Sequence, residues 1–516
     1  MRHKTTGVIV ALDNTDEFIH ELRKHYILVL SRGRLTVRKR KTFQSNIAFY
    51  IYTILSSVMI PLFTENKYFN ITKAKADMFY VGSLCVLVSM FVCVLFQKSR
   101  EKKAICQIEK ISPILFSGCA LISSVLSYSF ERSFLGLDGW RVGLYVIVVL
   151  SVIFFYLSSR QLDSAFMTKV ISVINIFIFG LVITDSMGMD IFGMHEMMLP
   201  NQYYDYVSTI GNVNQMAGYL SLIFLFLLVT VLTEKKSVWR NISQIALILG
   251  MFSIILCKSD GFYLGAGVCA FAMIPFLFKD KEMLTKTVTL GIAFCLTSLV
   301  IRFCGLFREK LKEIDGISQV VLNPEISVSL LIFLIIILFV LRRINLTDSM
   351  LRAIRITVTI GMIILVVWMG IINIKSASMD YYHWGSGRGA IWYESYRVYS
   401  EEYTLLQKLF GVGPDMLEQW YDNLSIGYGQ KILVSHSEPI QVLMTLGAVG
   451  FAIYVAMVAF TIKKIINLKS DKHATRYCLP VLAYYGQSLV NSATITNLSL
   501  LVLFLTFVYN NFSDKT

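Results

Sequence analysis

Two polar side chains, Arg388 and His436, have chemistry that differs from the largely apolar 516-residue chain around them. Arg388 lies between glycines in the stretch 387–392 (GRGAIW), which permits a tight backbone close to a ligand. Its guanidinium stays charged and presents a fork of donors that suits phosphate. His436 can be neutral near physiological pH and could accept or pass a proton. Each also has a plainer interpretation: His436 as a hydrogen-bonded surface residue, and Arg388 as an anchor to lipid headgroups.

Both residues belong to the segment 375–438, which is too long and too rich in aromatic and charged residues for a simple connection. We therefore expect it to be folded and functional. Within it, apolar residues recur at helical spacing over 390–410, which predicts one amphipathic helix that ends at 411–415 (GVGPD). Pro439 then opens an apolar helix with small residues at 447–450 (GAVG), which predicts a packing face.

The elements that must position these residues are membrane-spanning helices. The chain is 55% hydrophobic and only 16% charged, with a mean hydropathy of +0.62, which excludes an ordinary soluble enzyme. Apolar runs near the roughly 20 residues that cross a bilayer occur at about 45–63, 77–97, 111–128, 142–159, 168–187, 215–232, 241–257, 262–278, 286–303, 326–341, 354–374, 439–462, 477–491 and 494–510. We expect an all-α integral membrane protein, a polytopic bundle of about 12–14 transmembrane helices.

The net charge of +14 is mainly a topology signal, because the basic clusters fall on one side if fourteen spans alternate. The positive-inside rule then places both termini in the cytoplasm and 375–438 outside. No soluble module carries a basic face with stacking aromatics, so we expect no nucleic-acid partner. The expected parts are a basic arm 1–44, eleven helices in 45–374, the external segment 375–438, three helices in 439–510 and a tail 511–516.

Two further features have simple interpretations. The arm is either an amphipathic helix from Thr15 to about Leu30 in the cytoplasmic interface beside membrane lipids, or a solvated basic tail. The nine cysteines include no CxxC pair and mostly lie in apolar runs. We expect them to be small buried hydrophobes and predict no metal site.

Several short motifs, taken in order, resemble those of the O-antigen ligase and Wzy-type polymerase superfamily. The resemblance covers roughly 130–510 and is carried by 136–143 (GLDGWRVG), 208–217 (STIGNVNQMA), 387–392 (GRGAIW), 409–414 (LFGVGP) and His436-Ser437, followed nine residues later by 447–450 (GAVG).

The resemblance implies a bacterial membrane glycosyltransferase with a GT-C-like fold. Such a protein would transfer or polymerise glycan from an undecaprenyl-diphosphate carrier to a glycan, lipid or protein acceptor. The reaction would take place on the outer face of the cytoplasmic membrane, without metal or cofactor. It implies a catalytic role for His436 and diphosphate binding by Arg388. Arg141, Asn212 and Asn214 match binding motifs, although the asparagines could equally cap a helix.

The sequence departs from this family at one site. Many members have Ser-Arg-Gly at the external end of a central span, where this chain has 259–261 (SDG) preceded by Lys258. Either Lys258, Arg302 or Arg308 would then supply the missing cation, or phosphate is bound differently, and Asp260 could orient an acceptor hydroxyl. The motifs do not separate ligase from polymerase.

A transporter or flippase for a lipid-linked substrate is the competing class. It would favour ionisable residues or broken helices near the bilayer midplane, together with repeat symmetry.

Overall fold

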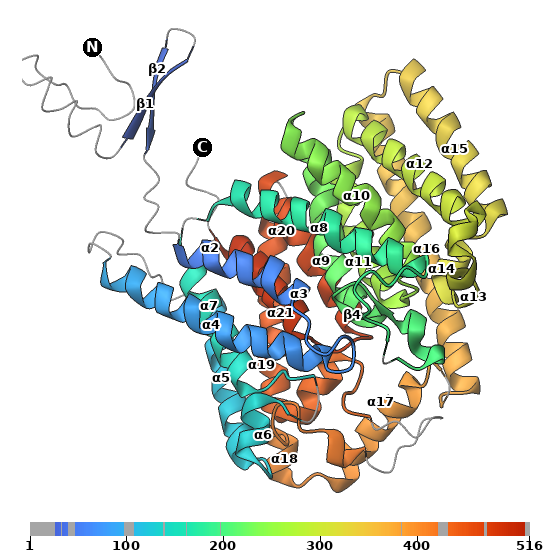
Figure 1. Ribbon diagram of the computed structural model, residues 1–516. Helices are drawn as coiled ribbons and strands as arrows, with labels where there is room; N and C mark the ends of the chain where they lie inside the picture. Colours follow the sequence, from blue (N-terminus) through green and yellow to red (C-terminus); the bar gives the residue numbers. More distant parts are fainter. Residues whose placement is uncertain are drawn as a thin grey trace, which may run out of the picture.

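The computed structural model describes residues 26–31, 34–39, 47–96, 108–137, 140–160, 162–196, 198–382, 384–421, 432–468 and 472–510. These residues are almost entirely helical (Figure 1). The first half comprises α2 (Ile47–Ile54), η3 (Leu55–Met59), α3 (Ile60–Leu62), α4 (Ile71–Leu95), α5 (Ile108–Leu126), α6 (Phe130–Leu135), α7 (Leu144–Leu157), α8 (Ser164–Ser186), η4 (Pro200–Asp205), α9 (Val213–Thr233) and α10 (Val238–Leu256).

The second half comprises α11 (Asp260–Leu277), α12 (Lys281–Phe303), η5 (Gly305–Phe307), α13 (Arg308–Lys312), α14 (Gly316–Val321), α15 (Pro324–Arg343), α16 (Asp348–Met379), α17 (Arg388–Arg397), η6 (Val398–Glu402), α18 (Leu405–Phe410), η7 (Glu418–Trp420), α19 (Glu438–Leu468), α20 (Lys472–Ser488) and α21 (Ile495–Tyr509). Two antiparallel pairs, β1 (Tyr26–Ser31) with β2 (Arg34–Lys39) and β3 (Tyr206–Val207) with β4 (Gly211–Asn212), complete the described chain.

The helices have the lengths and composition of a multi-pass membrane protein. Each of the fourteen apolar stretches lies on a helix, and ten described helices are long and apolar enough to cross a bilayer. Three shorter apolar helices span Ile47–Leu62, Leu144–Leu157 and Ile495–Tyr509. The prediction of an all-α polytopic protein is therefore confirmed at this level.

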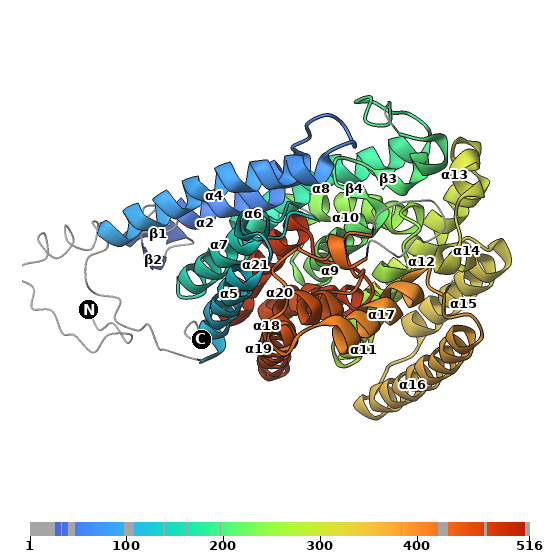
Figure 2. The ribbon, with the colours of Figure 1, turned by 90° about the horizontal axis from the view of Figure 1, so that it is seen from below.

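The bundle is built around α9, whose apolar stretch is almost wholly buried. Helices α10, α11, α20 and α21 pack against it, and α5 packs against α7 and α19. At the other extreme, no residue in the apolar window of α16 is buried, and the helix lies along the edge of the bundle (Figure 2). An apolar surface of that extent is stable only against lipid tails or another apolar surface.

The structure contradicts one of the two interpretations of the basic arm, the amphipathic helix, over residues 26–30. The second half of the arm, Tyr26–Lys39, forms the hairpin β1–β2 and is not helical. The strands YILVLS and RLTVRK are rich in β-branched and aromatic residues, and only Arg32 and Gly33 separate them, a spacing typical of a tight hairpin. Residues 1–25 and the tail 511–516 lie outside the described residues.

The structure also corrects the prediction of one amphipathic helix over 390–410. Helix α17 starts earlier, at Arg388, and passes into a π-helical turn, after which Tyr403 and Thr404 adopt extended backbone. Thr404 then starts α18 with a capping box, accepting from the Gln407 amide while the Gln407 side chain accepts from the Thr404 amide. This reciprocal cap makes a second helix start more favourable than continuation of the first.

Candidate functional site

Arg388 is the first residue of α17, and its side chain is held by hydrogen bonds to two backbone carbonyls. Its Nε donates to the Val490 carbonyl at 2.9 Å and its NH1 to the Gly385 carbonyl at 2.9 Å. Gly387, with a φ of +84°, makes the turn into the helix, as the glycine spacing predicted. Burial lowers the pKa of the Arg388 guanidinium, and the negative charge of Asp260 opposes that effect. The side chain nonetheless remains cationic at physiological pH.

His436 lies close enough to Arg388 for the guanidinium charge to affect the protonation of the imidazole. Burial and the nearby Arg388 together lower the pKa of His436 to about 4, so the imidazole is neutral at pH 7. Its backbone has a φ of +51°, a strained conformation for a non-glycine residue. Its buried Nδ1 makes no hydrogen bond within the described part of the chain. A neutral imidazole has one unprotonated nitrogen, which is able to accept a proton.

Asp260 and Asn491 complete the surroundings of Arg388. Asn491 Oδ1 accepts from Arg388 NH2 at 3.4 Å, and its carbonyl accepts from the Glu438 amide at 3.1 Å. Its Nδ2 donates to Gln487 Oε1 at 3.0 Å. Asp260, at the start of α11, accepts from the Ile317 amide at 2.9 Å. The link between α20 and α21 thus ties Arg388 to the helix that follows His436.

Trp140 connects this polar site to the 136–143 motif. Its ring meets that of His436 edge to face, with centroids 5.9 Å apart and planes at 83°. Asp415, from the 411–415 turn, accepts from the Trp140 amide at 3.2 Å and from the Arg141 amide at 2.7 Å. Two distant motifs are therefore joined beside the histidine. Asp138 and Gly139 of the first motif lie outside the described residues.

The predicted asparagines serve the backbone around the site. Asn212 caps α9 by accepting from the Asn214 amide at 2.9 Å, which is the plainer of its two interpretations. Asn214 accepts from the Ser259 hydroxyl at 2.9 Å and so fixes the turn that leads to Asp260. The second contact lies one residue away from the charged Lys258 and Asp260.

The predicted cations other than Arg388 lie in different surroundings. Lys258 pairs with Asp205 at 2.9 Å, on a backbone with a φ of +46°. Arg141 also has a positive φ, and its charge acts on the Tyr80 hydroxyl. Arg302 is exposed in the last turn of α12, and Arg308 is exposed at the start of α13. Among the predicted binding residues, Asp260 is the one whose charge acts on Arg388.

A second buried cation lies beside Lys258. Lys310 is fully buried, donates to the Tyr204 carbonyl at 2.8 Å and lies 5.1 Å from the centroid of the Tyr204 ring. Burial, followed by repulsion from Lys258, lowers the pKa of Lys310 to about 7. No sequence pattern singles out this lysine, because it follows a span in an ordinary basic stretch.

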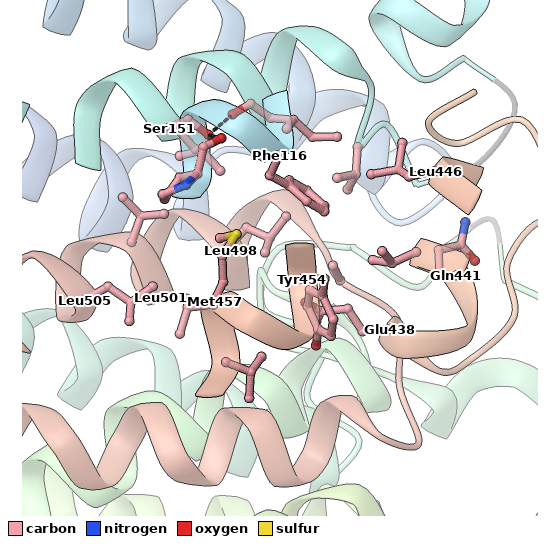
Figure 3. Close-up of a pocket in the computed structure, with 18 of the residues that line it drawn as sticks. Phe116, Ser151, Glu438, Gln441, Leu446, Tyr454, Met457, Leu498, Leu501 and Leu505 are labelled. Carbon is pink, nitrogen blue, oxygen red and sulfur yellow. Dashed lines mark hydrogen bonds between the residues drawn. The ribbon is translucent and has the colours of Figure 1, made fainter. Parts of the chain in front are cut away.

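A largely apolar cavity of about 190 Å³ extends inward from the site between α5, α7, α19 and α21 (Figure 3). Its volume is far above the roughly 10–15 Å³ that one water needs. Trp140, Asp415 and Glu438 line it near the polar site, and Leu498, Leu501 and Leu505 line it along α21. Glu438 accepts from the buried Tyr484 hydroxyl at 2.9 Å. Arg388 and His436 are not among the residues that line the cavity, which meets the polar site through Trp140, whose ring contacts that of His436.

Sequence reasoning missed Asn491, Asp415 and the role of Trp140. A signal existed for Asn491, because two amides, Gln487 and Asn491, interrupt an otherwise apolar stretch, and buried polar groups in a membrane usually have a purpose. Asp415 and Trp140 carried no such signal, because their pairing joins residues 275 positions apart. No family model and no curated protein matches this chain, so its function has to be argued from the geometry of this site.

Proposed function

We propose that the protein is a membrane glycosyltransferase. It takes a glycan from a polyprenyl-diphosphate carrier and transfers it to a hydroxyl acceptor, as an O-antigen ligase or Wzy-type polymerase does. The observation that carries the proposal is a cation beside a neutral histidine, next to an apolar cavity whose lining residue Trp140 contacts that histidine. A lipid-linked diphosphate has the complementary features: an apolar chain, an anionic junction and a reactive sugar carbon beyond it.

Each of the site residues then has a separate role in the proposed reaction. The acceptor hydroxyl attacks the anomeric carbon while its proton passes to the neutral imidazole of His436. The bond between that carbon and the diphosphate oxygen breaks, and the carrier leaves as polyprenyl diphosphate. Arg388 stabilises the negative charge that develops on the leaving group. Asp260 either orients the acceptor hydroxyl or holds Arg388 in place.

The same proposal places the protein in the bacterial cytoplasmic membrane with both termini in the cytoplasm and the site outside. The basic clusters next to the helix ends support this orientation.

Reconstitution tests the proposal. Purified protein in proteoliposomes, given a polyprenyl-diphosphate-linked oligosaccharide, should convert it to a ligated or longer product. His436→Ala and Arg388→Ala should each lower the rate at least about 100-fold, the usual loss for a proton-transfer group or an electrostatic donor. Arg352→Ala, at an exposed cation near the start of α16 to which no role is assigned, should retain wild-type activity.

Two outcomes contradict it. Normal turnover by both variants, with normal insertion, removes the assigned roles. Movement of the lipid-linked glycan across the bilayer without any covalent product shows a transporter or flippase instead.

A further inference from the structure

Trp140 occupies a position that the proposed reaction does not yet use. It lines the cavity and also touches His436, so it lies where the apolar chain of a carrier would meet the polar group attached to it. Its side chain is only partly covered by protein. An indole at such a boundary offers a flat apolar surface next to a polar site.

The backbone around Trp140 is built to hold it there. Gly136 and Gly143 approach so closely that a Cβ on Gly136 would lie 2.6 Å from the Gly143 nitrogen, which closes the loop that carries the tryptophan at its tip. Tyr80 donates to the Leu135 carbonyl at 2.6 Å and fixes the start of the same loop. The position of the tryptophan is therefore set by the fold.

Asp415 is the second support. Its carboxylate is buried and accepts from two consecutive amides, at Trp140 and Arg141. Its own turn is held to the bundle because the Gly413 amide donates to the Ser123 hydroxyl at 2.9 Å and the Thr445 carbonyl at 3.0 Å. A carboxylate that receives two amide donors makes charge-assisted bonds, which are stronger than neutral ones.

We infer that Trp140 is a specificity-determining residue that stacks on the isoprene units next to the phosphate of a polyprenyl carrier, and that Asp415 positions it. The inference rests on the proposed function and adds which part of the carrier Trp140 recognises. Isoprene units contain planar double bonds, which lie flat on an indole face. A saturated chain of equal length lacks that flat surface, so the site discriminates by chain chemistry as well as by the anionic head.

A binding experiment tests this without any need for turnover. The detergent-solubilised full-length protein is titrated with farnesyl phosphate and with its fully saturated analogue, hexahydrofarnesyl phosphate. The wild type should prefer farnesyl phosphate by about two- to tenfold, the range expected for a stacking contact. Trp140→Ala should bind both probes equally and Trp140→Phe should keep part of the preference. Trp239→Phe, on a half-exposed tryptophan at the start of α10, should leave it unchanged.

The positioning role of Asp415 has its own readout. Asp415→Asn keeps the shape of the side chain but weakens both amide contacts, so the preference should fall while the affinity for the phosphate head changes little. Asp348→Asn, on the exposed first turn of α16, is the matched control. Size-exclusion profiles identify any variant that fails to fold, and Trp140→Phe then carries the test.

Different results contradict the proposed function and the proposed role of Trp140. A Trp140-dependent preference in a protein that transfers no glycan leaves the lipid site standing and removes the glycosyltransferase. Transfer activity with equal binding of both probes, or a preference that survives Trp140→Ala, overturns the role of the tryptophan.

Discussion

At the residue scale, the central feature is a histidine kept neutral beside a cation. The same two causes, burial and the charge of Arg388, disfavour the imidazolium form of His436 and make the neutral form the resting state. An ordinary histidine would be partly protonated between pH 6 and 7 and would lose base activity there. If His436 is the base of the proposed reaction, the acid limb of its pH profile should lie well below that range.

The pH dependence of stability follows from that shift. The folded pKa of His436, about 4, lies below its unfolded value near 6.5, so between these values the unfolded chain binds more protons. The contribution of His436 is fully present above pH 6.5 and is lost as the pH falls toward 4. Thermal unfolding in detergent should show the wild type losing about 1–3 kcal/mol more than His436→Asn over this window. Parallel losses in the two proteins would contradict the shifted pKa.

Asn491 is the second prediction at this scale. Asn491→Ala removes an acceptor of Arg388 while leaving the guanidinium in place, so binding of the lipid-linked donor should weaken and catalysis should survive. We expect KM to rise about five- to tenfold, the value of one ordinary hydrogen bond of about 1–1.4 kcal/mol, because the contact is long at 3.4 Å, with kcat nearly unchanged. Asn373→Ala, on the exposed face of α16, is the control. A fall in kcat with constant KM would assign Asn491 to the reaction itself.

At the element scale, the packing of α18 on α19 depends on one glycine. Gly447 has a φ of +67° inside α19, where the helix is kinked, and a Cβ there would collide with the backbone of Leu409 and Phe410. The small residues at 447–450 thus allow close packing, as the sequence predicted. Gly447 makes its close approach to the backbone of α18, at Leu409 and Phe410. This contact holds the 411–415 turn, and with it Asp415, beside the bundle.

A pair of glycine substitutions tests that contact. Gly447→Ala combines a strained φ with a backbone collision and should destabilise the protein by at least about 2 kcal/mol. Gly361→Ala, in the lipid-facing α16 with open space around it, should be neutral or stabilise by up to about 1 kcal/mol. Thermal unfolding in matched detergent compares the two. Equal midpoints would show that α18 and α19 are not held together by this approach.

At the scale of the whole molecule, the orientation in the membrane stays a prediction that accessibility can check. Ser386, beside Arg388, and Ser237, before α10, are both exposed but are expected on opposite sides of the membrane. In a cysteine-free background, Ser386→Cys should react with a membrane-impermeant maleimide in spheroplasts whose plasma membrane is intact, and Ser237→Cys should react only after the membrane is opened. The reverse pattern would place the candidate site in the cytoplasm and exclude the proposed reaction.

The sequence by itself determined the class of protein and the position of its helices. The hydrophobic cost of exposing about 20 apolar residues to water is large enough to be visible in composition alone, and each of the fourteen stretches indeed lies on a helix. It also singled out Arg388 and His436 as candidates, from the glycines around Arg388 and the motifs in 375–438, and their roles stay predictions. The helical interpretation of the arm fails over 26–30 and the single helix over 390–410 was predicted wrongly, because hairpin pairing and a capping box outweigh a weak helical periodicity.

Only the tertiary structure decided which of those residues lie close to one another. It brought the charges of Arg388 and Asp260 together with His436, paired Lys258 with Asp205, and left Arg302 exposed. It also revealed the cavity and the clamp of Asp415 on Trp140. These features depend on contacts between residues from about 50 to 275 positions apart, and pairwise geometry of that kind leaves no local pattern in the sequence.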